Sequence, residues 1–300
     1  MLTQEKHGTT QKGDFMNLAF VCTGNTCRSP MAEAIFKEKI KDYADFCNVA
    51  SFGVNAMTGD TAAENAIIAM AELGIDISDH RSTRISNYVI DLCDYIICMD
   101  AVNYGIIELV AGEKAILLGN GIDDPFGGNI DVYKDCAKQI SEAIDLLLSS
   151  NLFFSTSLME SEDIPAVAEI EKQNFSEPWS ETSFVEELNN QYSICYVEKF
   201  LSKPVGYVCA QIFHPEAFLC TIAVDSGLRR RGVADRLVEI LSDYCEYKRC
   251  ETLSLEVRVS NEIAQKLYIK HKFENLGIRK NFYSKPTEDA YIMTKYFKED

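Results

Sequence analysis

The chain has 300 residues, 47% of them hydrophobic, and its 29 Lys and Arg residues against 46 Asp and Glu residues give a net charge of −17. This length is at the upper limit for one core, because single cores stop growing near ~250–300 residues, so two domains are expected. The negative charge disfavours direct nucleic-acid binding and attachment to an anionic membrane surface. No segment approaches the roughly 18 consecutive apolar residues that a membrane span needs.

Cysteine and histidine usage argues against disulfides and metal sites. The 11 cysteines are an odd number, and residues 1–15 lack the charged and apolar regions of a secretion signal, so reduced thiols in a cytoplasmic protein are expected. No Cys-x-x-Cys pair occurs, and the histidines lie too far apart for zinc-ligand spacing. The four histidines are His7, His80, His214 and His271. No structural metal is therefore expected.

The first half of the chain alternates strands and helices. Residues 1–15 are polar and aperiodic, and a disordered leader is expected there; a first domain is expected over residues 16–150. Its expected strands are 18–21, near Val49, 95–99 and 115–118, and its expected helices are 30–41, 61–73, 102–109 and 130–148. Six residues are expected on the buried face of the last helix: Val132, Cys136, Ile140, Ile144, Leu147 and Leu148. This alternation with apolar strands predicts an α/β domain with a doubly wound parallel sheet.

The second half begins with several consecutive strands. A boundary is expected at residues 149–151, where the last helix ends, and a second domain over residues 153–300. Its expected strands are near 153–158, at 193–197, 205–213, 218–224 and 252–257, and near 273–278 and 290–294. Its expected helices begin at Asp163 and span 229–247 and 261–271. Consecutive strands before alternation predict an α+β domain with a mixed sheet.

A cysteine and an arginine lie between the first expected strand and the first expected helix. The segment is Val21-Cys22-Thr23-Gly24-Asn25-Thr26-Cys27-Arg28-Ser29-Pro30. A loop that leads from a parallel strand into a helix N-terminus collects backbone N–H groups around one point, and the helix dipole favours an anion there. The same field stabilises a thiolate at Cys22, and the guanidinium of Arg28 can bind two phosphate oxygens.

This segment resembles the phosphate loop of the low-molecular-weight protein phosphatase family, and the resemblance extends over about residues 16–150. Similar segments are 51–54, 74–82 and 124–128. The resemblance implies that Cys22 is the nucleophile that forms a phosphocysteine, and that Asp124 is the acid for the leaving group and then the base for water. It also implies a phosphate site made of Thr23, Gly24, Asn25, Thr26, Cys27, Arg28 and Ser29. Within it, Asn25 would brace the loop and Ser29 would hydrogen-bond the sulfur of Cys22.

Two of these residues have a second interpretation. Without the family resemblance, Asp123-Asp124-Pro125 would be interpreted as a turn. Cys27 is either a packed thiol or a partner that forms a reversible disulfide with Cys22 and protects it from over-oxidation.

Positions 26 and 126 bear on the substrate of the first domain. Thr26 stands where typical tyrosine-directed members carry a bulkier aliphatic residue, and Phe126 stands where they carry tyrosine. Both positions resemble the bacterial protein-arginine phosphatases, and the hydroxyl of Thr26 can form hydrogen bonds near a guanidinium. A phosphorylated protein with phosphoarginine is therefore favoured as substrate over phosphotyrosine, with a neutral substitution at position 26 as the other interpretation.

Three arginines and two small residues open the helix that follows strand 218–224. The strand ends at Ile222, Ala223 and Val224, and the helix opens with Arg229, Arg230, Arg231, Gly232, Val233 and Ala234. Three consecutive arginines alone more often form a solvated basic patch. Small residues at 232 and 234, however, let backbone N–H groups approach a pyrophosphate. The arrangement resembles the acyl-CoA-binding motif of the GNAT acetyltransferases.

Further segments resemble the ribosomal-protein-alanine N-acetyltransferases of bacteria, over about residues 155–297. They are 175–180, which differs by two inserted residues, 255–261, 267–268 and 279–283. The resemblance implies acetyl-CoA as co-substrate, with Asn261 at the pantetheine arm. The other residues that it implies for cofactor binding are Ile222, Val224, Arg229, Arg230, Arg231, Gly232, Val233 and Ala234. It implies that Glu256 takes a proton from the α-ammonium of a ribosomal-protein N-terminus and that Tyr268 returns one to the CoA thiolate.

The residues themselves are compatible with these roles but do not require them. Alternation along the strand places Glu256 on its more polar face with Ser254 and Arg258, where a carboxylate alone would be a solvated group. A tyrosine at position 268 is more often a core residue. Trp179 is either a core anchor or part of a peptide-binding wall, and His214 and His271 are interpreted as structural.

Three rival interpretations are kept. The first domain could be a thiol redox enzyme similar to arsenate reductases, although Cys93 and Cys98 are expected on strands as core residues. The chain could join a phosphotyrosine phosphatase to an acetyltransferase with another amine specificity. One half could instead be a regulatory module with an inactive site.

Overall fold

The structure is a computed structural model that describes residues 15–297, so the leader expected at residues 1–15 lies outside the described part except for its last residue. The chain divides into two compact units, residues 1–153 and 154–300. Each unit has its own sheet. Within the described range, none of the helices is both long enough and apolar enough to cross a bilayer.

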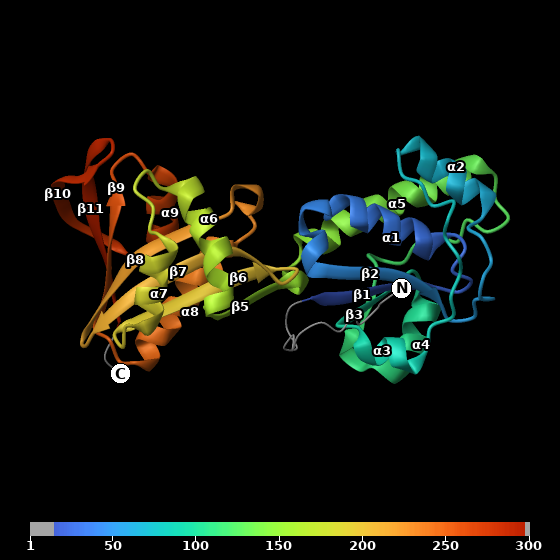
Figure 1. The fold of residues 1–300 in the computed structure, drawn as a ribbon, viewed down its shortest axis with the longest axis horizontal. Coiled ribbons are helices and arrows are strands. Elements are labelled where there is room, and N and C mark those ends of the chain that lie inside the picture. The colour runs from blue at the N-terminus through green and yellow to red at the C-terminus, as the bar shows by residue number, and fades with distance from the viewer. Residues whose placement is uncertain (1–14, 298–300) are drawn as a thin grey trace. The chain divides into compact units, whose positions relative to one another are not determined.

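The first unit is built on a four-stranded parallel sheet in the order β2-β1-β3-β4. The strands are β1 Met16–Cys22, β2 Cys47–Gly53, β3 Tyr95–Cys98 and β4 Ala115–Leu117. The helices are α1 Arg28–Lys39, α2 Glu64–Glu72, α3 Asn87–Leu92, α4 Ala101–Ala111 and α5 Ile130–Ser149, with short 3-10 turns η1 Lys41–Phe46, η2 Gly112–Lys114 and η3 Asn151–Phe153. Helices α1, α2 and α5 lie on one face of the sheet, and α3 and α4 lie on the other (Figure 1). The doubly wound α/β class is confirmed.

A row of packed aromatic side chains lies at one end of the core of the first unit. The ring of Phe20 on β1 lies 5.3 Å from that of Phe36 on α1, and Phe36 lies 5.9 Å from Phe153. Phe153 is 1% exposed. The chain therefore passes into the second unit immediately after a residue that is anchored in the first core.

Three details of the first unit differ from the expectation. Helix α2 begins at Glu64 rather than at 61, because Thr61 forms an isolated bridge with Arg81. The short helix α3 was not expected and is capped by Ser86. On α5, Val132 is 44% exposed, and the buried face holds Tyr133, Cys136, Ala137, Ile140, Ile144 and Leu148. Cys136, Ile140, Ile144 and Leu148 are buried as expected, and Leu147 is half-buried. At the start of the helix Tyr133 is buried in place of Val132, and its phenol contacts the buried sulfur of Cys27.

The second unit has a seven-stranded sheet in the order β10-β11-β9-β8-β7-β6-β5. The strands are β5 Phe154–Leu158, β6 Ser193–Phe200, β7 Lys203–Phe213, β8 Glu216–Val224, β9 Thr252–Arg258, β10 Glu274–Ser284 and β11 Thr287–Tyr296. The helices are α6 Ile164–Asn174, α7 Glu181–Asn189, α8 Val233–Tyr247 and α9 Glu262–Lys270, with 3-10 turns η4 Ser161–Asp163 and η5 Ser226–Leu228. All neighbours are antiparallel except β8 and β9. The mixed sheet expected here is confirmed.

Helices cover both faces of the second sheet. Tyr207 belongs to the core cluster that α6 and α7 form with β6, β7 and β8. Its neighbour Gly206 points to the opposite face, because successive strand residues alternate, and a Cβ there would lie 2.6 Å from Val233 of α8. Helix α8 therefore packs directly on the backbone of β7.

Helix α8 begins later than the pattern predicts. It starts at Val233 rather than at 229, because Arg230 and Gly232 have φ values of 64° and 76°, a left-handed conformation that cannot continue a right-handed helix. Helix α7 was not expected, although Ser180 provides the cap at its start. Strands β10 and β11 are longer than expected because they pair with each other as a hairpin.

Substitution of Gly53 should reveal how tightly β2 packs on the loop after β1. A Cβ at Gly53 would lie 2.7 Å from the carbonyl oxygen of Thr23 and 2.9 Å from Ala56 Cβ, so Gly53→Ala should lower the free energy of unfolding by about 1–3 kcal/mol. Gly105 in α4 has nothing within 4 Å of such a Cβ, and Gly105→Ala should raise stability by about 0.5–1 kcal/mol. Urea unfolding followed by circular dichroism measures both changes. If the two variants shift the free energy of unfolding in the same direction, the tight packing inferred at Gly53 is contradicted.

Candidate active sites

Cys22 ends β1 and lies at the base of the loop that enters α1. Its side chain is buried, and its sulfur lies 3.0 Å from Ser29 Oγ. The backbone N–H of Asn25 donates to the same sulfur at 3.2 Å. The sulfur, which is the nucleophilic atom of a cysteine, therefore lies within hydrogen-bond distance of one hydroxyl and one backbone N–H group.

Asn25 holds the loop from the inside. It is fully buried and has a left-handed φ of 57°, which asparagine adopts more readily than most residues. Its amide nitrogen donates to Ser29 Oγ at 2.9 Å and to Ser51 Oγ at 3.0 Å, and its amide oxygen accepts from the N–H of Thr83 at 2.8 Å. The loop conformation is therefore tied to β2 and to the segment that follows α2.

Arg28 is the first residue of α1, and its guanidinium is held by three acceptors. Nη1 donates to Asp100 Oδ2 at 2.8 Å and to the carbonyl oxygen of Ile122 at 3.1 Å, and Nη2 donates to Asp124 Oδ2 at 2.8 Å. The Arg28 side chain is only 5% exposed, whereas that of Asp124 is 52% exposed. Arg28 is thus fixed in place, and Asp124 has access to solvent.

Asp100 and Asn103 are site residues that the motif did not indicate. Asp100 caps α4 by accepting from the N–H of Asn103, and its second oxygen accepts from Arg28 and from the amide of Asn103. That amide also lies 3.4 Å from Thr23 Oγ1. A sequence signal existed, because Asp100 follows Met99 at the carboxyl end of β3. Strand β3 is a parallel neighbour of β1, so the carboxyl ends of both strands meet at one edge.

The remaining loop residues differ in exposure. Cys27 is buried, with its sulfur 3.3 Å from the phenol of Tyr133, which is the environment of a packed thiol. Thr26 is half-buried and its carbonyl oxygen accepts from the N–H of Ala63. Phe126 is 81% exposed. Position 126 therefore lies on the surface, where it can contact a bound substrate.

The thiols named for the redox alternative are buried in this structure. Cys98 lies on β3 as expected, but Cys93 follows α3 and is not on a strand. Both belong to the core, and burial raises the pKa of each thiol to about 12. Such thiols stay protonated near neutral pH, which disfavours an arsenate-reductase-like reaction through them.

In the second unit, the predicted pyrophosphate loop forms the turn before α8. Gly232 caps the helix in a left-handed conformation, and Arg229 donates to the side chain of Asn174 at 2.7 Å. Asp235 in the first helical turn would repel an anion, but its carboxylate is engaged by Lys270 at 2.6 Å and His271 at 2.9 Å. The start of α8 therefore keeps the electrostatic character of an anion site.

Two parted strands lead away from this loop. Strands β8 and β9, which we call the parted strands, pair with each other only over Glu216–Phe218 and Thr252–Ser254. Beyond these residues each strand continues without a described pairing between the two, as far as Val224 and Arg258. Backbone groups along both inner edges can then bind an extended ligand. A turn with left-handed glycine at one end and parted strands beside it fit the pyrophosphate and the arm of acetyl-CoA.

The predicted proton-transfer residues lie on β9 and α9. Glu256 is on the polar face of β9, with one carboxylate oxygen 2.8 Å from Arg279 Nη1. Tyr268 is 5% exposed and packs on Phe273, and burial raises the pKa of its phenol. Tyr268 therefore carries its proton near neutral pH, as a proton donor must. Asn261 uses its side-chain oxygen to cap α9 at Ala264.

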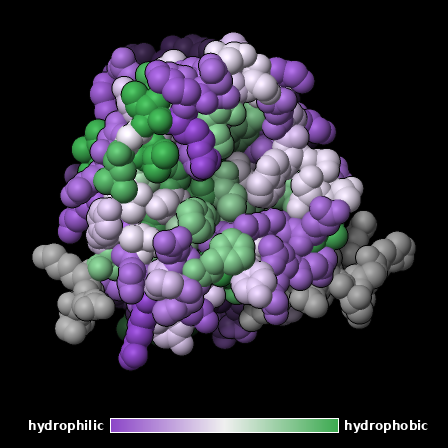
Figure 2. All heavy atoms as spheres, turned by 90° about the vertical axis from the view of Figure 1, so that its left-hand side faces the viewer, coloured by the Kyte–Doolittle hydropathy of each residue, from purple (hydrophilic) through white to green (hydrophobic). Residues whose placement is uncertain are grey.

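The β10–β11 hairpin forms an exposed edge beside Glu256. Strand β10, at the far left of Figure 1, is the first strand of the sheet, and three of its large apolar side chains are exposed: Leu276, Ile278 and Phe282. Figure 2 faces this side and shows apolar residues in green among polar residues in purple. Arg279 binds Glu256 and Lys280 binds Asp289. The hairpin is therefore tied to the strand that carries the predicted base.

A buried carboxylate that the sequence reasoning missed lies on α6. Glu171 is 2% exposed and accepts hydrogen bonds from the phenol of Tyr207, from Thr221 Oγ1 at 3.4 Å and from the N–H of Trp179 at 3.1 Å. Trp179 itself packs on the core at Phe184. Trp179 is thus a core anchor, and Glu171 fixes the segment between α6 and α7.

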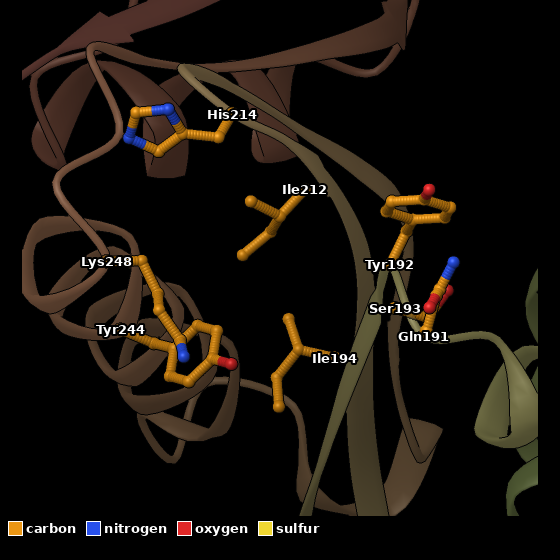
Figure 3. Close-up of a pocket in the computed structure, with 8 residues that line it drawn as sticks. All are labelled: Gln191, Tyr192, Ser193, Ile194, Ile212, His214, Tyr244 and Lys248. Carbon is orange, nitrogen blue, oxygen red and sulfur yellow. The ribbon is translucent and has the colours of Figure 1, made fainter.

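A separate pocket of about 230 Å³ lies at the opposite end of α8 (Figure 3). Tyr244 and Lys248 from the end of α8 face Ile194 of β6 and Ile212 of β7 there. Because a helix rises about 1.5 Å per residue, this pocket is remote from Gly232. His214 lies at its upper edge in Figure 3 and contacts the carbonyl oxygen of Arg249. The pocket is therefore not part of the predicted acetyl-CoA site.

Comparisons with known proteins match each unit separately. Residues 17–160 match the family described as low molecular weight phosphotyrosine protein phosphatase, and residues 164–273 match the acetyltransferase (GNAT) family. A Bacillus subtilis (strain 168) protein named protein-arginine-phosphatase is 35% identical over 139 residues, which are 43% of this chain and 92% of that protein.

Two acetyltransferases match the second unit. A protein of the same Bacillus subtilis strain, named putative ribosomal protein bS18-alanine N-acetyltransferase, is 39% identical over 136 residues, 45% of this chain and 90% of that protein. An Escherichia coli (strain K12) protein named ribosomal protein bS18-alanine N-acetyltransferase is 37% identical over 141 residues, 46% of this chain and 93% of that protein. Each relative is therefore matched over nearly its whole length by one of the two units.

Glu171 should make the stability of the second unit depend on pH. Burial raises the pKa of this carboxyl against the opposing effect of its hydrogen bonds. Between the ordinary pKa of a glutamate and the raised value, the folded state holds a proton that the unfolded state has lost, so stability falls as pH rises through this range. Urea unfolding followed by Trp179 fluorescence should show this slope, and Glu171→Gln should flatten it. Glu169→Gln, at an exposed position of the same helix, should keep the slope, and equal slopes in all three proteins would contradict the assignment.

Proposed function

Because the chain belongs to the low molecular weight phosphatase family in its first unit and to the GNAT acetyltransferase family in its second, we propose that it is a bifunctional enzyme. Both families are enzyme families, and the GNAT family uses acetyl-CoA. The proposed activities are a cysteine-dependent protein phosphatase that prefers phosphoarginine and an acetyltransferase for the N-terminal alanine of a ribosomal protein. Such an acceptor fits a cytoplasmic location.

The first activity is supported by three side chains that lie close to the start of α1, those of Cys22, Arg28 and Asp124. The sulfur of Cys22 would attack phosphorus and form a P–S bond while the P–N bond of phosphoarginine breaks, and Asp124 would protonate the leaving nitrogen. Water activated by Asp124 would then break the P–S bond and release phosphate. Arg28 and the loop N–H groups would bind the phosphoryl oxygens in both steps. The observation that carries this proposal is the Arg28–Asp124 contact of 2.8 Å beside the hydrogen-bonded sulfur of Cys22.

Thr26 and the relatives support phosphoarginine as the preferred substrate. The hydroxyl of Thr26 lies in the half-buried part of the loop, 3.7 Å from the sulfur of Cys27. It can accept or donate a hydrogen bond near a guanidinium or order a water molecule there, which an aliphatic side chain cannot do. The relative named protein-arginine-phosphatase covers this same unit.

The substrate preference can be measured with paired peptides. The wild type should hydrolyse phosphoarginine peptides with a higher kcat/KM than phosphotyrosine peptides. Thr26→Ile should lower that ratio by about 3- to 10-fold, because one hydrogen bond is worth about 0.5–1.5 kcal/mol. Cys22→Ser should remove both activities and so controls for contaminating phosphatases. A wild type that prefers phosphotyrosine, or an unchanged ratio in Thr26→Ile, would overturn the preference.

The second activity is supported by Glu256, Tyr268 and the turn at Gly232. Glu256 would take a proton from the substrate α-ammonium so that the amine can attack the acetyl carbonyl, and the Tyr268 phenol would protonate the departing thiolate. The turn before α8 would bind the pyrophosphate through backbone N–H groups. Arg279 contacts one oxygen of Glu256 and so orients the carboxylate. The observation that carries this proposal is the left-handed Gly232 at the start of α8 beside the parted strands.

Substitution of Glu256 tests the proposed base. Glu256→Gln removes the proton acceptor but keeps the size of the side chain, so kcat for acetylation of an alanine-initiated ribosomal peptide should fall by about 10²–10⁴-fold. Calorimetry should give nearly the same Kd for acetyl-CoA as in the wild type. Glu262→Gln, at an exposed position of α9, should retain wild-type turnover. Unchanged turnover in Glu256→Gln would refute the role of this residue.

A further inference from the structure

A side chain outside the acyl-CoA motif reaches back into the pyrophosphate loop. Arg236 lies in the second turn of α8, and its Nη1 donates to the carbonyl oxygen of Arg231 at 3.2 Å. Gly232 makes room for this contact, because a Cβ at that position would lie 3.0 Å from Nη1. The glycine therefore serves both the left-handed turn and the approach of the guanidinium.

The guanidinium of Arg236 is itself fixed by the sheet. Its Nε lies 2.5 Å from Oε1 of Glu198, a fully buried residue of β6. The other oxygen of Glu198 accepts from the hydroxyl of Thr156 on β5. The ring of Phe154 lies 4.4 Å from the guanidinium carbon. Contacts from two strands thus set the direction in which Nη1 points.

The contact with Arg231 determines the direction of a neighbouring donor. In a trans peptide the carbonyl oxygen and the N–H of the next residue point in opposite directions. Holding the Arg231 oxygen toward Arg236 therefore turns the N–H of Gly232 away from Arg236. Successive N–H groups in a turn with left-handed residues form a concave anion site, and a site that is ordered before binding loses less entropy when the ligand arrives.

Fold stability alone does not explain this ion pair, in which Glu198 is fully buried and the Arg236 side chain is 22% exposed. An ion pair with a buried member contributes little compared with well-packed apolar residues, because charge must leave water. Lys199 and Asp163 form another ion pair with a buried carboxylate in the same unit, 2.7 Å apart. The Lys199–Asp163 pair joins the start of α6 to β6. In the Arg236–Glu198 pair, by contrast, the guanidinium also donates to the Arg231 oxygen of the pyrophosphate loop.

We propose that Arg236 and Glu198 are positioning residues for acetyl-CoA, which hold the pyrophosphate loop with its N–H groups toward the ligand. The inference rests on the proposed acetyltransferase function and goes beyond its motif, whose defining positions are Arg229, Gly232 and Ala234. The pair acts on the pyrophosphate alone. It should therefore affect the binding of CoA and leave the binding of pantetheine, which lacks the pyrophosphate, unchanged.

The test compares these two ligands in the full-length protein. Arg236→Lys keeps a cation beside Glu198 but is too short to hold both Glu198 and the Arg231 oxygen, so the fold should persist while the loop loses its support. We expect the Kd for CoA, measured by calorimetry, to rise about tenfold, as for the loss of one to two hydrogen bonds, with the Kd for pantetheine unchanged. The KM for acetyl-CoA should rise in parallel, with kcat and the peptide KM retained.

Two further variants separate positioning from stability. Glu198→Gln should raise the Kd for CoA in the same direction, since it releases the guanidinium. Lys199→Met should lower the melting temperature without changing the Kd for CoA. A wild-type Kd for CoA in Arg236→Lys, or an equal loss of pantetheine affinity, would overturn the proposal. A wild type that binds CoA but does not acetylate the peptide would refute the proposed acceptor and leave the positioning test valid, and a wild type that binds no CoA would refute both.

Discussion

Both candidate sites depend on one physical constraint, the unpaired backbone N–H groups at the start of a helix that follows a strand. Helix α1 begins at Arg28 after the loop from β1, and helix α8 begins at Val233 after the turn from β8. The first N–H groups of any helix lack partners within the helix, and the helix dipole adds positive potential there. A phosphoryl group at the first site and a pyrophosphate at the second would satisfy the same kind of backbone donor. The two units therefore offer anion-binding backbone groups at equivalent local positions, the start of a helix that follows a strand.

Loops of this kind need support from behind, because N–H groups that converge on a ligand point their carbonyl groups elsewhere. In the first unit the support is Asn25, a buried side chain within the loop that bonds to β2 and to Thr83. In the second unit it comes from Arg236, outside the loop, which is held by Glu198. Each loop also contains a left-handed residue. The shared requirement is a fixed backbone, whereas the residues that meet it differ.

Most of the fold can be predicted from the sequence, because the period at which apolar residues repeat indicates which face of a helix or strand is buried. The strands and long helices of both units lie close to their expected positions. The residue types that anion binding needs predict a phosphate site in the loop from Cys22 to Ser29. Asp100, Glu171, Glu198 and Arg236 were missed, since each acts through contacts between elements far apart in the chain. The start of α8 was misplaced because left-handed φ values at Arg230 and Gly232 leave no periodic signal.

The net charge of −17 repels phosphate groups, whereas both candidate sites would attract them, but the two effects act over different distances. Salt screens exposed charges beyond roughly 8 Å at physiological ionic strength. At shorter range, the buried guanidinium of Arg28 and the helix N–H groups would determine the potential that a phosphoryl group experiences. The acidic surface acts mainly on the encounter, where it attracts the cationic partners proposed for both units, arginine-bearing protein segments and a ribosomal-protein N-terminus. An acidic surface can therefore attract basic substrates while the helix starts in both units would bind the anionic phosphoryl and pyrophosphate groups.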